Sequence, residues 1–82
     1  MRILFYGRLA EAIAPGIELD NSSGCSVSQL RQMLAAAHPD AAAILASKRS
    51  RVCVGHSLVG EDHLIGPGEQ VEFLPPVSGG AT

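Results

Sequence analysis

One strongly marked helix start, in the stretch CSVSQL at residues 25–30, constrains the fold of this chain more than any other feature. Ser26 is placed to cap a helix, and Gln29 stands three residues later, which predicts a capping box. Cys25 and Leu30 occupy the two positions of a hydrophobic staple. We therefore expect a helix that begins at Ser26 and packs one face on a core.

The apolar residues that follow give this helix a single face for burial. They recur at steps of three, four and three residues and form the stripe Val27, Leu30, Leu34 and Ala37. The residues expected to face outward are Arg31, Gln32 and Ala35. His38-Pro39 ends the helix, because the residue before a proline avoids the α region. Residues 40–46 can form a second short helix with Asp40 as its cap.

Short strands are predicted on both sides of the helices. Residues 2–6 (RILFY) predict a strand inside a sheet and covered on both faces, and residues 16–20 (GIELD) alternate as a half-exposed strand does. About one helical turn fits between them. Residues 51–60 predict a strand with a bend or hairpin at Gly55, and residues 70–74 predict a last strand. This order predicts an α+β fold of the β-grasp type, in which a mixed sheet packs on one main helix.

Length and charge limit the possible partners. The 82 residues allow one small domain, and a formal net charge of −2 without a long basic run argues against a nucleic-acid partner. No apolar stretch approaches the roughly 20 residues of a membrane span, and the N-terminus lacks a secretory signal, so we expect a cytoplasmic protein with no membrane partner. Cys25 and Cys53 are expected to be reduced thiols, because a disulfide scaffold would normally carry more cysteines.

The spacing of polar residues predicts neither a metal site nor a catalytic centre. Cys53 and His56 lie three residues apart, so on a strand they point to opposite faces. We expect a packed Cys53, with His56 and His63 facing solvent. Adjacent carboxylates such as Glu61-Asp62 are more typical of a solvated turn than of acid-base chemistry. The domain is therefore expected to carry no catalytic apparatus and no bound cofactor of its own.

The chain ends in LPPVSGGAT, residues 74–82, whose small residues cannot pack a core. Two prolines would stiffen the start of this segment, and two glycines would let the backbone approach another protein's active site closely. Fully extended, residues 75–80 span roughly 20 Å. We expect a domain at residues 1–76 and a flexible tail at residues 77–82 that carries a carboxyl group into a partner. A frayed C-terminus is the alternative.

The end of the chain, residues 57–80, resembles the small subunit of molybdopterin synthase, a family of ubiquitin-like sulfur carriers in molybdenum cofactor biosynthesis. The residues that match the family motif one by one are Phe73, Pro75, Pro76, Val77, Gly79 and Gly80. The stretches ILFYGRLAEAIA and VSQLRQMLAAAHPD are similar to the family as well, so the resemblance covers nearly the whole chain.

The resemblance implies a carrier whose reactive group is built on Gly80 by other proteins. An adenylating enzyme similar to ubiquitin-activating enzymes would join the Gly80 carboxylate to AMP from ATP, and a sulfur donor would replace the AMP to leave a thiocarboxylate. The synthase large subunit would then bind the tail and use the sulfur to convert cyclic pyranopterin monophosphate to molybdopterin. The tail residues expected to bind in its channel are Pro75, Pro76, Val77, Ser78 and Gly79.

The last two residues, Ala81-Thr82, depart from the family pattern, because this chemistry requires glycine at the end of the chain. We expect their removal to free the Gly80 carboxylate. A thiamine-type sulfur carrier and a ubiquitin-like binding module with an inert tail are the alternative functions. The partner surface is expected on the sheet near the start of the tail, with contacts from Phe73, Leu74 and Val77. The alternative for Phe73 is a place in the core.

Overall fold

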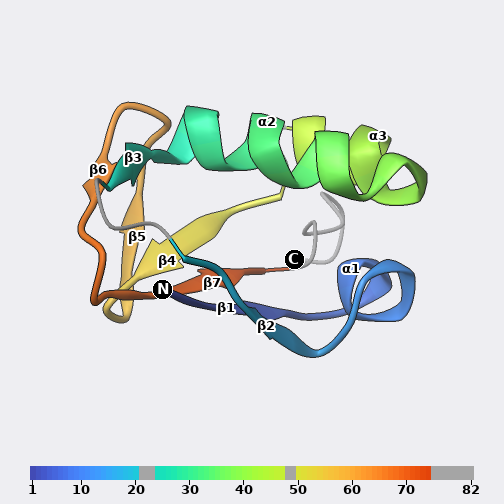
Figure 1. Cartoon of the computed structure of the whole chain (residues 1–82), viewed down its shortest axis with the longest axis horizontal. Helices are drawn as coiled ribbons and strands as arrows, with labels where there is room; N and C mark the ends of the chain where they lie inside the picture. Colours follow the sequence, from blue (N-terminus) through green and yellow to red (C-terminus); the bar gives the residue numbers. More distant parts are fainter. Residues whose placement is uncertain (21–23, 48–49, 75–82) are drawn as a thin grey trace, which may run out of the picture.

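A five-stranded mixed sheet forms one layer of the molecule, and the helices within residues 27–46 form the other (Figure 1). The computed structural model describes residues 1–20, 24–47 and 50–74, so the predictions made for residues 75–82 lie outside the described residues. The strands lie in the order β2-β1-β7-β4-β5. They span Arg2–Phe5 (β1), Gly16–Glu18 (β2), Val52–Val54 (β4), Ser57–Val59 (β5) and Gln70–Phe73 (β7).

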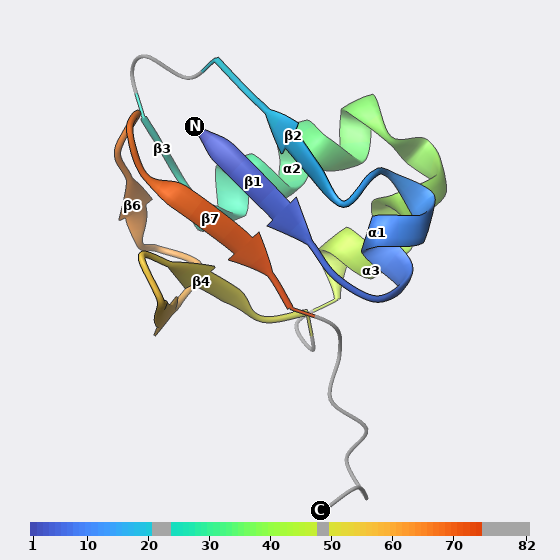
Figure 2. The same ribbon diagram turned by 90° about the horizontal axis from the view of Figure 1, so that it is seen from below.

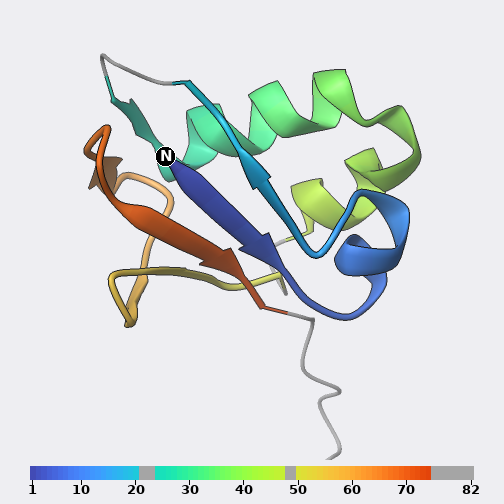
Figure 3. The ribbon, with the colours of Figure 1, turned by 60° about the horizontal axis from the view of Figure 1, so that its bottom comes forward.

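The first and last strands lie side by side in the sheet (Figure 3). β1 pairs with β7 in parallel, whereas the pairs β1 with β2, β4 with β7 and β4 with β5 are antiparallel. A second sheet of two short strands joins β3 (Cys25–Ser26) to β6 (Leu64–Ile65), which the sequence patterns did not predict. The mixed sheet and its main helix confirm the predicted β-grasp.

Helix α2 (Val27–Ala37) begins where the capping box predicts. The Gln29 backbone N–H donates to Ser26 Oγ at 3.1 Å, and the Ser26 N–H donates to Gln29 Oε1 at 2.9 Å. The helix ends before His38, also as predicted. The cap assigned to Asp40 is wrong, because Asp40 lies inside a 3₁₀ helix (η1, Pro39–Ala41) and its side chain makes no capping bond. Helix α3 (Ala42–Ala46) follows η1, and α1 (Arg8–Ala12) lies between β1 and β2.

The buried face of α2 differs from the predicted stripe at two positions. Val27, Leu30 and Leu34 are buried as expected, but Ala37 is exposed and Arg31 is buried. The expectation that Arg31 faces outward is therefore wrong. Positions 27, 30, 31 and 34 follow the i, i+3, i+4, i+7 spacing of one helical face, so an arginine stands in the buried stripe.

The core lies between α2 and one face of the sheet. Alternate residues of β1 and β7 point into it, and the Phe5 and Phe73 rings stack with their centroids 5.6 Å apart. β1 lies inside the sheet, as predicted, but it is not covered on both faces, since Leu4 is half-buried and Arg2 exposed. Figure 2 shows β1, β7 and β4 from the side opposite α2, where no described helix covers them. The sheet therefore presents one face to solvent.

The predicted turn at Gly55 is a two-residue hairpin between β4 and β5. Gly55 and His56 both adopt positive φ, at 57° and 73°, as the two central residues of a type I′ turn do. His56 and His63 are exposed and Cys53 is buried, as expected. Cys25 and Cys53 carry thiols rather than a disulfide.

Within residues 1–20, 24–47 and 50–74, no group of three or more His, Cys, Asp or Glu side chains is arranged to hold a metal ion. None of the helices in this part of the chain combines the length and the apolar character that crossing a membrane requires.

Candidate functional site at the start of the tail

The start of the tail is held against the strand beside it. β7 ends at Phe73, and the next residue, Leu74, still donates its backbone N–H to the Arg51 carbonyl at 2.8 Å. The Leu74 carbonyl accepts a hydrogen bond from Ser50 Oγ at 3.4 Å. Backbone and side-chain contacts therefore fix the position of Leu74, the residue that precedes Pro75.

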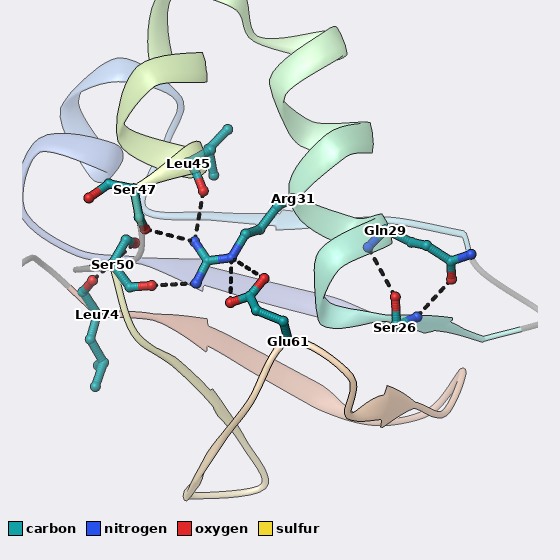
Figure 4. Close-up of polar contacts among 8 residues, drawn as sticks. All are labelled: Ser26, Gln29, Arg31, Leu45, Ser47, Ser50, Glu61 and Leu74. Atoms are coloured by element: carbon teal, nitrogen blue, oxygen red, sulfur yellow. Dashed lines mark hydrogen bonds and ion pairs between the residues drawn. The ribbon is translucent and has the colours of Figure 1, made fainter.

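Ser50 is in turn held by Arg31, whose side chain reaches from α2 towards the start of β4 (Figure 4). The guanidinium donates from Nη1 to the Leu45 carbonyl at 2.7 Å and to the Ser47 carbonyl at 3.4 Å, and from Nη2 to the Ser50 carbonyl. Its Nε donates to both carboxylate oxygens of Glu61, at 2.9 and 3.0 Å. The Arg31 side chain is only 10% exposed.

These bonds satisfy a buried charge and join separate parts of the chain. A buried guanidinium is costly unless its donors are paired, and here three backbone carbonyls and one carboxylate accept them. Arg31 also lies over the Phe73 ring, with Cζ 5.6 Å from the ring centroid. The last turn of α3, the segment before β4 and the end of β7 are thus connected through one side chain.

The sheet face opposite α2 adjoins the start of the tail and carries apolar side chains around one carboxylate. Strand alternation and register place on this face, which we call the outer sheet face, Leu4, Tyr6, Cys53, Leu58, Glu72 and Leu74, together with Arg2 of β1 and Arg51 beside the start of β4. Leu58 is 58% exposed and Tyr6 39% exposed. The Tyr6 hydroxyl donates to Glu72 Oε2 at 2.7 Å, and this hydrogen bond raises the pKa of Tyr6 above its usual value.

The structure separates the residues predicted as partner contacts. Phe73 is fully buried in the core, so its prediction as a surface contact is wrong and its alternative place is the observed one. Leu74 is half-buried at the edge of the outer sheet face, where a partner can reach it. Val77 and the other predicted tail residues, which include Gly80, lie outside the described residues.

The sequence patterns did not single out the buried Arg31 and Ser50 or the exposed Tyr6 and Leu58. A signal for Arg31 was present, because it follows Val27 by four residues and Leu30 by one within the apolar stripe. The other three depend on contacts between distant parts of the chain.

A surface hollow of about 310 Å³ beside α2 has no arrangement suited to catalysis. It is lined by Ser28, Arg31, Gln32, Ala35, Ala46 and Glu61. Among its described lining residues, the one cationic and the one anionic side chain bind each other, and none is a histidine that could activate the Ser28 hydroxyl. The described chain thus combines an exposed sheet face with a backbone that is fixed up to Leu74.

Comparison with known proteins shows which family the sequence matches. The family model described as ThiS family matches residues 3–80. The molybdopterin synthase sulfur carrier subunit of Escherichia coli (strain K12) is 30% identical over 80 residues, which cover 98% of this chain and 99% of that protein.

Two solved structures from Haloferax volcanii share the fold. SAMP1 superposes with a TM-score of 0.80 at 21% identity, over 96% of this chain and 97% of that one. The HVO 2177 protein gives a TM-score of 0.79 at 21% identity, over 96% of this chain and 84% of that one. At this identity the two likenesses bear on the fold alone, and they agree with the β-grasp described above.

Proposed function

Since this chain belongs to the ThiS family, we propose that it is a ubiquitin-like sulfur carrier, and more narrowly the sulfur carrier subunit of a molybdopterin synthase. The observation that carries the narrower proposal is the 30% identity to the Escherichia coli subunit over nearly the full length of both chains. The Pro-Pro-Val-x-Gly-Gly sequence at residues 75–80 supports it.

In this function the reactive atom is the carboxylate carbon of Gly80. An adenylating enzyme joins a Gly80 carboxylate oxygen to the α-phosphorus of ATP and releases pyrophosphate. A persulfide on the sulfur donor then attacks the acyl carbon and AMP leaves, and a thiol reduces the resulting acyl disulfide, which leaves the thiocarboxylate on Gly80 and a disulfide on the thiol side. ATP is therefore a substrate of the partner enzyme, and this chain needs no cofactor of its own. The synthase large subunit takes the sulfur from Gly80 to convert cyclic pyranopterin monophosphate to molybdopterin.

The described residues support the division of labour that this function requires. A carrier must be recognised by at least two proteins while its reactive end stays free to enter their active sites. The outer sheet face is available for recognition, and Leu74 stands where that face meets the start of the tail. We propose that Leu74 and Val77 contact the large subunit. Phe73, the residue before Leu74, supports this contact indirectly, because its ring packs in the core and anchors the end of β7.

The proposed function can be tested at Gly80, because adenylation requires a free carboxylate on this residue. In the encoded chain the Gly80 carbonyl is part of an amide with Ala81, and an amide cannot take the place of a carboxylate in adenylation. We propose that a protease removes Ala81-Thr82. With purified adenylating enzyme and ATP, a chain that ends at Gly80 should exchange pyrophosphate into ATP, and the full-length chain should not.

The possible results separate the candidate functions. Equal adenylation of the full-length chain without cleavage would show that the precursor proposal is wrong. If neither form reacts, the binding module with an inert tail becomes the better explanation. Mass spectrometry of the protein from its native host gives an independent test, since a carrier should end at Gly80 with one oxygen replaced by sulfur.

A thiamine-type sulfur carrier is the second candidate. The family match extends to residue 80 and so includes both tail glycines, which any carrier of this kind uses. The two roles differ in the protein that accepts the sulfur. We expect the thiocarboxylated chain to support molybdopterin formation with the synthase large subunit, and to give no product with the sulfur acceptor of thiamine synthesis. The reverse result would favour the second candidate.

Neither cysteine is needed for the proposed sulfur transfer. Cys25 and Cys53 are both buried in the described structure, and the sulfur is carried by Gly80. A Cys25→Ser, Cys53→Ala variant that ends at Gly80 should still support molybdopterin formation. Circular dichroism checks beforehand that the variant is folded. Loss of turnover with a normal amount of thiocarboxylate would assign a chemical role to a thiol.

A further inference from the structure

We propose that the outer sheet face binds a partner whose apolar surface carries one cationic side chain, an arginine or a lysine, directed at Glu72. Glu72 would then determine which proteins this face accepts. The inference rests on the proposed function, because it takes the synthase large subunit as the partner on this face.

Glu72 lies in the middle of the outer sheet face rather than at its rim. It belongs to β7, the central strand of the sheet order. In the register, Glu72 is opposite Leu4 of β1 on one side and Cys53 of β4 on the other, and Cys53 is opposite Leu58 of β5. A row of apolar side chains thus runs across the sheet and is interrupted by one carboxylate. A partner that covers the row must also cover Glu72.

Glu72 forms no ion pair within the described part of the chain, although Arg2 and Arg51 lie on the same face of the sheet. The ion pairs found there join Arg2 to Glu18, at the β2 side of the sheet, and Arg31 to Glu61, on the helix side. Glu72 instead accepts one hydrogen bond from the neutral Tyr6 hydroxyl at 2.7 Å. A carboxylate offers about four acceptor positions, so this bond leaves room for donors from another protein.

Tyr6 holds the carboxylate in place for such a donor. The two residues are 66 positions apart in the sequence, and the parallel pairing of β1 with β7 brings them together. A fixed carboxylate loses less conformational entropy on binding than a free one, and it accepts the forked donors of an arginine in one defined orientation.

The free energy of binding at this face depends on whether the partner places a cation over Glu72. An apolar partner would remove water from Glu72 and leave a charge with a single neutral donor, which weakens binding. A partner that presents a guanidinium or an ammonium replaces the lost water with a charge-assisted hydrogen bond. The same carboxylate therefore favours cationic partners and rejects purely apolar ones.

The experiment measures binding of the purified synthase large subunit to the chain by calorimetry, with Glu72→Gln as the test variant. Glutamine keeps the shape of the side chain and removes its charge. We expect Glu72→Gln to raise the Kd at least about tenfold. Glu11→Gln removes an equal charge from an exposed residue of α1 and should leave the Kd unchanged. If Glu72→Gln binds as well as the parent or more tightly, the inference is overturned, because a partner without a cation gains when the carboxylate is removed.

A second variant keeps the charge and removes its hydrogen-bond donor. Tyr6→Phe should weaken binding less than Glu72→Gln does, because the carboxylate can still meet the cation of the partner. The opposite order would assign selectivity to the hydroxyl and overturn the inference. Failure of the unchanged chain to bind the large subunit would contradict the proposed function as well, whereas normal binding by both parent and Glu72→Gln contradicts this inference alone.

Discussion

Replacing Arg31 by methionine tests whether the buried guanidinium network holds the domain together. Methionine is as good a helix former as arginine and keeps the apolar stem, so α2 should form normally. What the substitution removes is the set of donors to the carbonyls of Leu45, Ser47 and Ser50, together with the cation over Phe73.

The expected loss follows from the burial of the acceptors. The bonds to the Leu45 and Ser50 carbonyls are buried, and a buried acceptor left without its donor costs about 1–3 kcal/mol. The Glu61 side chain is 43% exposed, so it can return to water and adds little. We expect a loss of about 3–5 kcal/mol in the free energy of unfolding, similar to the breaking of other buried pairs. For a domain of this size, that lowers Tm by on the order of 20 °C.

Urea unfolding followed by circular dichroism measures this loss directly. Glu61→Gln is the matched control, because it removes the carboxylate of the same pair at a position that water reaches, and it should cost less than about 1 kcal/mol. Arg31→Lys should fall between the two, since one ammonium cannot reach all the carbonyls that the guanidinium bridges. An Arg31→Met variant within about 1 kcal/mol of the parent would refute the reasoning, because the carbonyls would then have found other donors.

Three other substitutions test single contacts. Glu72→Gln should lower the Tyr6 pKa towards its usual value, measured by the phenolate absorbance of the single tyrosine; an unchanged titration would contradict the assigned cause. Because the folded-state pKa of Tyr6 is the higher one, its contribution to stability is complete below about pH 10 and is lost as the pH rises through that pKa. Ser26→Ala should cost about 1 kcal/mol in urea unfolding, and no loss would mean that the cap bond is unimportant. Gly24→Ala should cost more than about 1 kcal/mol, since Gly24 has φ 77° and an added Cβ would lie 2.8 Å from a backbone oxygen, whereas Gly60→Ala, in open space, should change little.

Features that depend on neighbouring residues could be predicted from the sequence. The capping box needs only Ser26 and Gln29, and the helix ends where Pro39 forbids its continuation. The hairpin at Gly55 needs a residue that accepts positive φ. In each case the residues that decide the structure lie within about four positions of each other, so a local pattern contains the information.

Features that depend on distant residues could not be predicted in the same way. Arg31 can be buried because backbone carbonyls and a carboxylate accept its hydrogen bonds. These acceptors lie 14 to 30 positions further along the chain, beyond the range of a local pattern. Asp40 is displaced from its expected cap by a 3₁₀ turn that leads into α3. Local helix rules treat an arginine as a surface residue and an aspartate before a helix as a cap, and both rules fail where tertiary contacts supply the partners.

Neighbouring residues at the end of β7 have opposite roles because a strand alternates its faces. Phe73 points into the core, where its ring meets Phe5 and the Arg31 guanidinium, and Leu74 emerges at the edge of the outer sheet face. The prediction that both residues contact a partner ignored this alternation. Val71 and Glu72 show the same alternation, since Val71 is buried and Glu72 is half-buried. The proposed carrier function is compatible with this arrangement, because Phe73 anchors the end of β7 in the core and Leu74 stays accessible. Changes at Phe73 should therefore act on folding, and changes at Leu74 on partner binding.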